Sequence, residues 1–222
     1  MDTITVLERE MYTVAEAARL LRVPPSTLTW WLEGRDKYLP VIRPERTGSK
    51  NVTWGEFVEA GYLHEYRQKS VPLGEVRQFV ERLRDKFQVP YPLAHYKPFV
   101  GEGRRLVLEI EDDSGLPTAF RLVVAIASGE LLLTAPAESF LERVEFSSDD
   151  AQWAQRWRPA GKTSPVVIDP EKSFGAPTVS GIRTDTLVEL VAAGEPHEIV
   201  AADFGIDASE VKAAVAYEWA AA

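Results

Sequence analysis

Residues 161–163, Gly-Lys-Thr, are of the types that hold nucleotide phosphates in a phosphate-binding loop. In such a loop, backbone N–H groups surround the phosphates and the lysine neutralises their charge. The motif needs a glycine five positions before Gly161, and Arg156 stands there instead. Gly101-x-Gly103 lacks the third glycine and the preceding strand of a dinucleotide-binding turn. The sequence therefore predicts no nucleotide site.

The side chains that could bind a metal or transfer a proton are poorly placed for either task. His64, His95 and His197 lie far apart in the sequence, and no second ligand type stands at metal-binding spacing. Aspartates are paired at 112–113 and 149–150, where adjacent carboxylates favour turns over a nuclease metal site. No nucleophile is accompanied by a base. We expect no catalytic residue, no metal ligand and no cofactor, so the chain is not expected to be an enzyme.

Charge is distributed unevenly along the 222 residues, whose net charge is −9. Residues 1–97 carry fifteen Lys and Arg against thirteen Asp and Glu, whereas residues 98–222 carry ten against twenty-one. The first part can therefore approach phosphate and the second repels it. The absence of cysteine fits a reducing cytoplasm. We expect neither a signal peptide nor a membrane span, because no positively charged start precedes an apolar run and no such run is long enough.

The last third of the chain has closely spaced helix start and stop signals. We predict helices at 184–193, at 196–203 and from Asp207 onward, where Asp207 and Glu210 form a capping-box pattern. Gly194 and Gly205 fit helix ends, and Pro196 fits a first turn. The apolar face predicted for the third helix consists of Val211, Ala214, Val215 and Trp219.

Three short helices joined by tight turns can read DNA or dock on a protein, and charge favours the second. Residues 165–222 hold three Lys and Arg against ten Asp and Glu, a net charge of −7. DNA binding needs several cations, each of which releases counterions from phosphate. A protein partner, basic rather than acidic, is therefore the better prediction for this region.

The same region resembles the C-terminal module of VapB-type antitoxins, the inhibitory halves of type II toxin–antitoxin pairs. The resemblance covers the last sixty or so residues. It rests on Asp169-Pro170, Phe174-Gly175-x-Pro177, Gly181-Ile182-Arg183-Thr184, Gly194-Glu195 and Val211-x-x-Ala214 with Tyr217. The resemblance implies a PIN-like ribonuclease as the partner and no catalytic residues in this chain.

The first third of the chain predicts a helix-turn-helix. Thr13 and Glu16 form a capping box, the turn at 22–24 follows, and Pro25 fits the start of a second helix. Ser26, Thr27 and Trp30 are predicted to lie on the outward side of that helix, which in DNA-binding proteins enters the major groove.

A wing and two more helices are predicted to follow, from the apolar run 39–42, the basic segment 43–51, a capping box at Thr53 and Glu56, and a long helix at 72–87. This order resembles the winged helix-turn-helix of MerR-like regulators across residues 11–87. The resemblance gives Trp31 a core position, Trp30 a backbone contact and Lys50 the place of the wing arginine. Thr29 departs from that family's phosphate-binding arginine, which makes dimeric binding more necessary.

The middle of the chain predicts a small antiparallel β-sheet that links the two helical ends. Its expected strands are 105–111, 120–126 and 131–134, with 140–146 either strand or short helix. Residues 160–164 are the expected hinge. We therefore predict an α+β protein with a winged helix-turn-helix at 1–97, a β-rich linking or dimerisation segment at 98–164 and a three-helix toxin-binding module at 165–222.

The predicted function is that of a dimeric cytoplasmic antitoxin that neutralises a PIN-like ribonuclease toxin and represses its own operon by binding operator DNA. The predicted DNA contacts are Arg22, Arg43, Arg46 and Lys50 to the backbone, and Ser26, Thr27 or Trp30 to bases. The predicted toxin contacts are Ile182, Arg183, Tyr217 and Trp219.

Three alternatives stay open from the sequence. One is a hydrolase in the middle segment, although the missing catalytic constellation counts against it. Arg183 either pairs with carboxylates at the toxin's metal site or bridges within its own loop. The whole chain could instead be a MerR-like transcriptional regulator without a toxin partner. Its middle region would then bind a small molecule in a pocket lined by Phe140, Trp153 and Trp157.

Overall fold

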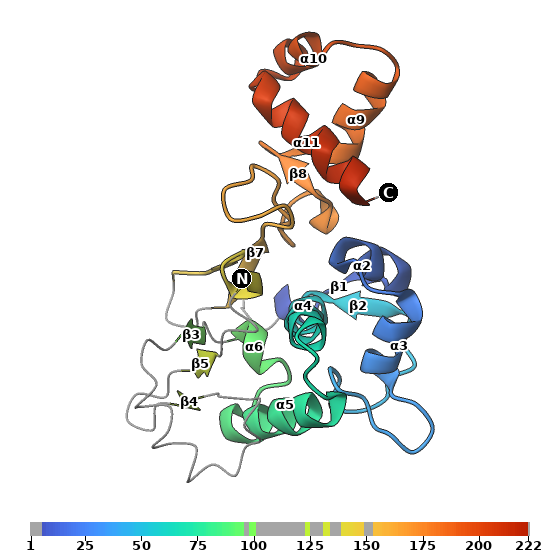
Figure 1. Ribbon diagram of the computed structural model, residues 1–222, viewed down its shortest axis with the longest axis vertical. Coiled ribbons are helices and arrows are strands. Elements are labelled where there is room, and N and C mark those ends of the chain that lie inside the picture. Colours follow the sequence, from blue (N-terminus) through green and yellow to red (C-terminus); the bar gives the residue numbers. More distant parts are fainter. Residues whose placement is uncertain are drawn as a thin grey trace. The chain divides into compact units, whose positions relative to one another are not determined.

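The computed structural model describes residues 6–95, 98–100, 123–124, 131–133, 139–148 and 153–221 (Figure 1). The chain divides into two compact units. The N-terminal unit contains residues 1–142 and 146–154, and the C-terminal unit contains residues 143–145 and 155–222. None of the helices within the described ranges combines the length and apolar character needed to cross a membrane.

The N-terminal unit begins with the predicted pair of helices. Strand β1 (Glu10–Thr13) pairs antiparallel with β2 (Asn51–Thr53) and leads into α2 (Val14–Leu21). The Thr13–Glu16 capping box is confirmed, because each residue's side chain accepts the other's backbone N–H. After a left-handed residue at Arg22, α3 (Pro25–Glu33) starts with proline in its first turn, as predicted.

The segment between α3 and β2 differs from the predicted wing. Residues 39–50 form an irregular loop, and β2 pairs with β1 rather than with a strand from this loop. Gly34 ends α3 with φ +70°, and a Cβ there would lie 2.3 Å from the carbonyl oxygen of Tyr38. The loop then returns to α3, where the N–H groups of Val41 and Ile42 both donate to the Trp31 carbonyl. Hydrogen bonds to the last turn of α3 therefore hold this loop in place of the strand pairing expected for a wing.

Two long helices and a short one complete the core of this unit. Helix α4 (Trp54–Gln68) starts at the confirmed Thr53–Glu56 capping box, and α5 (Leu73–Phe87) follows Pro72 as predicted. Helix α6 (Pro92–His95) packs beside α4. Phe140 lies against Gly61 of α4, where a Cβ would come 2.0 Å from its ring. Glycine is needed here for close packing rather than for its backbone freedom.

The middle region is only partly within the described residues. Strand β4 (Val123–Val124) falls inside the predicted strand 120–126, and β5 (Leu131–Leu133) falls inside 131–134. The predicted strand 105–111 lies outside the described residues. Strands β4 and β5 pair antiparallel, as predicted, and β3 (Pro98–Val100), which was not predicted, pairs with β5 in parallel. Residues 139–141 are helical and β6 (Val144–Phe146) follows, so the stretch 140–146 is partly each.

The C-terminal unit is built on a small β framework. Strand β7 (Ala154–Trp157) pairs with β6, and the boundary between the two units falls within both strands. Trp157 exchanges two backbone hydrogen bonds with Ile168. Strands β8 (Thr178–Val179) and β9 (Ile182–Arg183) form an antiparallel hairpin that leads into the helices.

The three predicted helices are present. They are α9 (Thr184–Ala192), α10 (His197–Phe204) and α11 (Ala208–Ala221). Gly205 ends α10 in the left-handed conformation, and the Asp207 N–H donates to the Glu210 carboxylate as one half of the expected capping box. The core of the unit consists of Val166, Val179, Leu187, Val200, Ala201, Val211, Ala214 and Tyr217.

The predicted apolar face of α11 is wrong at one position. Trp219 is 68% exposed, and Tyr217 is buried in its place. A spacing of three from Ala214 reaches Tyr217, whereas a spacing of four from Val215 reaches Trp219. Both spacings occur on a helix face, so only packing against the neighbouring helices decides between them.

Candidate functional site

The first candidate surface is the outward face of α3. Ser26 is exposed and Thr27 half-buried in the first turn, and Trp30 lies one turn later with 38% of its surface exposed. Trp31 points inward and is buried. The N-terminal residues of a recognition helix are those that reach base edges in the major groove. The three residues predicted for base contact therefore lie on one surface of one helix.

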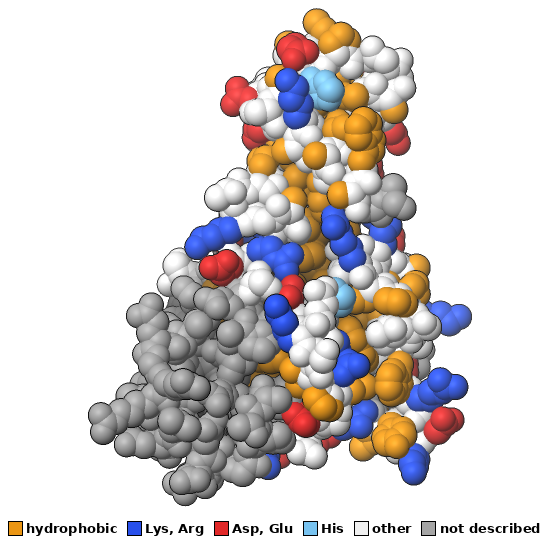
Figure 2. All heavy atoms as spheres, in the orientation of Figure 1, with side chains coloured by type: hydrophobic (Ala, Val, Ile, Leu, Met, Phe, Trp, Pro, Cys, Tyr) orange, Lys and Arg blue, Asp and Glu red, His pale blue; other side chains and the backbone are white. Residues whose placement is uncertain are grey.

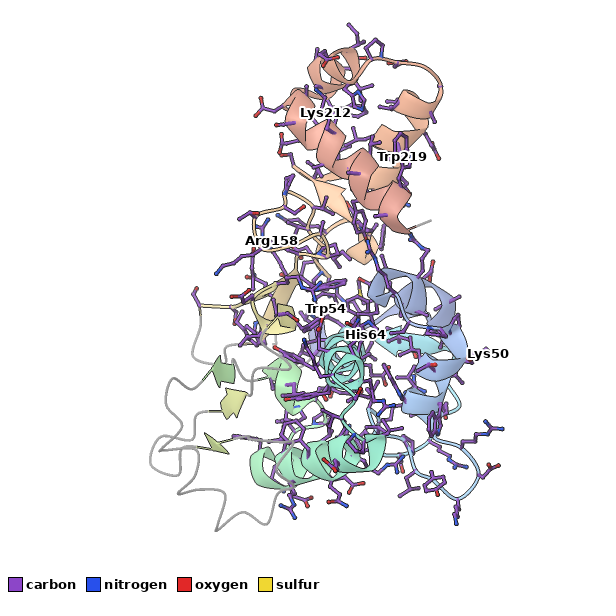
Figure 3. All side chains as sticks on the ribbon, in the orientation of Figure 1. Lys50, Trp54, His64, Arg158, Lys212 and Trp219 are labelled. Carbon is purple, nitrogen blue, oxygen red and sulfur yellow. The ribbon has the colours of Figure 1, made fainter. Side chains whose placement is uncertain are left out.

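Three of the four cations that are predicted to contact the DNA backbone are exposed. Arg22 follows α2 directly, and Arg46 and Lys50 lie in the loop before β2. Arg46 donates to the carbonyl oxygens of Asp36 and Tyr38, which fixes its part of the loop. Lys50 lies beside β2 (Figure 3). Arg22 lies between α2 and α3, Arg46 and Lys50 follow α3, and all three side chains are open to solvent.

The prediction that Arg43, the fourth of these cations, contacts the DNA backbone is wrong. Its side chain is 2% exposed, and all five of its N–H donors are used inside the protein. Nε donates to Glu56 at 2.7 Å and Nη2 to the other Glu56 oxygen at 3.2 Å, while Nη1 pairs with Glu33. The remaining donors reach the carbonyl oxygens of Ser49 and Asn51. Arg43 therefore holds the loop instead of offering a surface charge.

The network around Arg43 joins several elements of the N-terminal unit. Glu33 ends α3, Glu56 lies in the first turn of α4, and Tyr91 donates its hydroxyl to Glu56 at 3.3 Å. Burial, followed by the charge of Glu56, raises the pKa of Tyr91 to about 12. The sequence signals no such role for Arg43, because its basic neighbours suggest an exposed segment. The burial of Arg43 becomes evident only from its ion pairs with Glu33 and Glu56 in the structure.

The second candidate surface is one end of the C-terminal unit. The carbonyl oxygen of Pro177 accepts the Thr184 N–H at 3.0 Å, and the Thr184 hydroxyl donates to Glu218 of α11. This chain of contacts brings the hairpin, the start of α9 and the last turns of α11 together. Arg183 and Trp219, two of the predicted toxin contacts, are the direct neighbours of Thr184 and Glu218.

The four predicted toxin contacts differ in exposure. Trp219 is largely exposed on α11 (Figure 3), Arg183 is exposed and Ile182 is half-buried. Tyr217 lies in the core of the unit and is not part of its surface. Arg183 forms a two-point ion pair with Asp185, with Nε 3.0 Å from Oδ1. The hydrogen bond to Arg183 lowers the pKa of Asp185, so the pair is charged at neutral pH.

Acidic and apolar side chains both occur on the surface of the C-terminal unit. Figure 2 shows orange apolar groups and scattered red acidic groups on its visible face, together with blue basic groups. Of the exposed large apolar side chains of this unit, Phe174 precedes β8 and Trp219 lies on α11, whereas Ile199 and Phe204 lie on α10, outside the candidate surface. Apolar anchors within a rim of one charge are typical of a protein-binding surface for a partner of the opposite charge.

The three aromatic residues of the alternative ligand pocket, Phe140, Trp153 and Trp157, are divided between the two units. Phe140 and Trp153 are buried in the N-terminal unit, and Trp157 is buried in the C-terminal unit. The Phe140 ring contacts Tyr62 with centroids 4.8 Å apart, and Arg143 lies over the Trp157 ring. The rings of Phe140 and Trp157 are therefore each packed against a side chain of their own unit.

The histidines have structural surroundings. The His64 ring lies 2.6 Å from the amide nitrogen of Gln68, one turn later on α4 (Figure 3). Burial lowers the pKa of His95. Within the described parts of the chain, no three His, Asp or Glu side chains are grouped so that they could hold a metal ion.

Known relatives match the chain along nearly its whole length. The sequence is 33% identical over 226 residues to the uncharacterized protein Rv2308 of Mycobacterium tuberculosis, covering 98% of this chain and 93% of that protein. This chain belongs to the Rv2308 family. A second relative from the same organism, named "Putative antitoxin VapB45", is 27% identical over 223 residues and 92% of both chains.

A solved structure is also similar to this chain. The X-ray crystal structure of Rv2018 from Mycobacterium tuberculosis matches 94% of this chain and 99% of its own, with a TM-score of 0.69 and 25% identity. Residues 166–217 match the family described as "Protein of unknown function (DUF433)". This match covers α9, α10 and α11 as far as Tyr217.

Proposed function

We propose that this chain is the antitoxin of a type II toxin–antitoxin pair, which binds and neutralises a PIN-like ribonuclease and represses its own operon. The observation that carries the proposal is the similarity to the protein named putative antitoxin VapB45, which spans 92% of both chains. An acidic C-terminal unit with an exposed tryptophan and arginine at one end supports it. We further propose that the chain itself has no enzymatic activity.

The proposed inhibition is a matter of charge and shape. A ribonuclease must present a positively charged groove to hold RNA, and residues 165–222 have a net charge of −7. Such complementarity speeds association and disfavours wrong partners. Trp219 supplies apolar contact area. Arg183 is already paired with Asp185, and a carboxylate of the nuclease metal site would replace or share that partner.

The partner is tested with the product of the gene beside this one. We expect the full chain to co-purify with that product and to suppress its ribonuclease activity. Arg183→Ala is expected to raise the dissociation constant about tenfold or more, because the variant loses a two-point hydrogen-bond donor. The midpoint temperature of thermal unfolding should not change, since Arg183 is exposed. Both quantities are measured on the purified complex and the free protein.

Lys212→Ala is the matched control for this change. Lys212 is an exposed cation of the same unit that pairs with Glu198 at 3.5 Å on the surface (Figure 3). Its removal should leave toxin affinity within about threefold, as expected for an exposed pair. If Arg183→Ala inhibits as well as the unaltered protein, Arg183 has no part in the interface. If the unaltered protein neither binds nor inhibits the neighbouring gene product, the antitoxin proposal fails.

The N-terminal unit is proposed to bind operator DNA as a homodimer. Trp30 and Ser26 would meet the major groove through α3, while Arg22, Arg46 and Lys50 would contact phosphates. Arg43 is no longer among these contacts because it is buried. Three phosphate contacts per protomer are few, so a dimer is needed to bind tightly.

Salt dependence tests the DNA half separately. With three phosphate contacts per protomer, the slope of log affinity against log salt should be about −3 per protomer. Lys50→Ala should weaken binding to the upstream region and reduce that slope by about 1, whereas Lys172→Ala in the C-terminal unit should leave both unchanged. Fluorescence anisotropy between 50 and 300 mM salt, roughly the range in which the effect is large, measures both. Salt-insensitive binding would contradict the assignment.

A further inference from the structure

Residues 168–177 form a compact loop that is closed at its base. Val167 and Thr178 exchange two backbone hydrogen bonds, of 2.8 and 2.9 Å, across its ends. The ends of the loop therefore meet while about ten residues project beyond them. Loops of this length with joined ends are compact, surface-exposed and often functional.

The apex of this loop presents an aromatic ring to solvent. Phe174 is 93% exposed, the most exposed of the large apolar side chains in the described chain. Ser173, Phe174 and Gly175 all have positive φ, at 47°, 54° and 72°. Residues other than glycine adopt this conformation at a steric cost, and non-glycine residues held there cluster at binding sites. A phenylalanine here is therefore unfavourable in two ways, through its backbone and through its exposure.

A buried carboxylate and two backbone hydrogen bonds below the apex hold the strained backbone in place. Asp169 is buried; it accepts the Glu171 N–H at 2.9 Å with one oxygen and Arg156 Nε at 2.8 Å with the other. Backbone hydrogen bonds from Gly175 to Lys172 and from Ala176 to Ser173 close the turn itself. The ring is thus presented on a fixed support, which reduces the entropy lost when it binds.

The loop ends beside the proposed toxin surface. Pro177, its last residue, is bonded to Thr184, whose hydroxyl donates to Glu218. Arg183 and Trp219 adjoin these two residues in the chain. The loop that carries Phe174 is therefore joined at Pro177 to the end of the unit that carries the predicted contacts. The sequence marks Phe174 only as part of a motif.

We propose that Phe174 is the central anchor of the toxin interface and inserts into an apolar pocket that lies within the cationic surface of the ribonuclease. This inference rests on the proposed antitoxin function. The net charge of −7 across residues 165–222 selects a basic protein as the occupant. The acids guide association, and the ring determines how long the complex lasts, because buried aromatic anchors act mainly on dissociation.

Phe174→Asn removes the ring and keeps the backbone, because asparagine accepts the left-handed conformation. Binding of the full-length chain to the immobilised product of the adjacent gene is measured by biolayer interferometry. We expect Phe174→Asn to raise the dissociation constant about thirtyfold, mainly through faster dissociation, with the association rate within about threefold. Phe174→Tyr should stay within about threefold. The thermal midpoint should match that of the unaltered chain.

Ile199→Ala is the matched control, because Ile199 is an exposed apolar side chain of α10 in the same unit, 52% exposed, and lies outside the loop. It should bind as the unaltered protein does. Unchanged binding of Phe174→Asn, with the unaltered chain binding well, would refute the anchor and leave the antitoxin function standing. Failure of the unaltered chain to bind would refute both. A lower thermal midpoint for Phe174→Asn would assign the ring to folding and overturn its role as an anchor.

Discussion

Arg43→Ala is expected to destabilise the N-terminal unit by about 3–5 kcal/mol, the range for removing one member of a buried ion pair. The change leaves the buried carboxylate of Glu56 without its bidentate partner, and leaves the carbonyl oxygens of Ser49 and Asn51 without donors. Because whole domains are stable by only about 5–15 kcal/mol, such a loss would bring the unit close to unfolding. Urea unfolding followed by circular dichroism measures it.

Two further variants separate charge from packing at this position. Arg43→Lys keeps a positive charge but offers a single ammonium group, so it should recover only part of the stability. Combining Arg43→Met with Glu56→Gln removes both charges and keeps the volume, and it should be more stable than Arg43→Met alone. A loss below about 1 kcal/mol for Arg43→Ala would show that the network is not important for stability.

Glu59→Gln is expected to stabilise the protein at alkaline pH. Glu59 is fully buried on α4, and its Oε1 accepts the Leu93 N–H at 2.8 Å. Within the described residues, its Oε2 has no hydrogen-bond partner. Burial raises the pKa of Glu59 to about 7, although the charge of Arg84 and the Leu93 hydrogen bond act in the opposite direction.

The direction of the pH effect follows from the raised pKa. The unfolded chain releases this proton near its ordinary pKa of 4.5, and the folded chain holds it until about 7. The contribution of protonated Glu59 to stability is therefore complete below about pH 4.5 and is lost as the pH rises through 7. The loss amounts to about 3 kcal/mol, because each tenfold difference in proton affinity between the folded and unfolded chains corresponds to about 1.4 kcal/mol.

Urea unfolding of Glu59→Gln at pH 5, 6, 7 and 8 checks this expectation. The variant should match the unaltered protein near pH 5 and be more stable by about 2–3 kcal/mol at pH 8. Glu45→Gln, an exposed change in the loop before β2, should follow the unaltered protein at every pH. Lower stability of Glu59→Gln at pH 8 would instead mean that Glu59 is charged and held by Arg84.

The sequence predicts the helices well where local signals carry the information. The capping boxes at Thr13 and Thr53 and the starts of α3 and α5 at prolines depend on residues no more than a few positions apart. The burial of Arg43 could not be predicted, because Arg43 is bound by Glu56, thirteen residues away, and by the carbonyl groups of Ser49 and Asn51. Partners at that separation leave no periodic pattern in the sequence.

The candidate surfaces are only partly visible in the sequence for a similar reason. The outward position of Trp30 follows from helix spacing, but the choice between Tyr217 and Trp219 depends on how α11 packs. Phe174 could not be recognised as exposed, because a phenylalanine in a loop is more often buried than displayed. Its exposure depends on three consecutive left-handed residues, which no rule based on residue type predicts at Ser173 and Phe174.

The β framework of the C-terminal unit also defines which residues a separately produced fragment of this unit must contain. The DUF433 match begins at residue 166, yet the compact unit also draws on residues 143–145 and on the chain from 155 onward. Trp157 pairs with Ile168, and Arg156 neutralises the buried Asp169 beneath the loop. The segment that would have to be transferred to another protein is therefore discontinuous. A fragment that begins at residue 166 would lack β7, to which Ile168 and Asp169 are bonded.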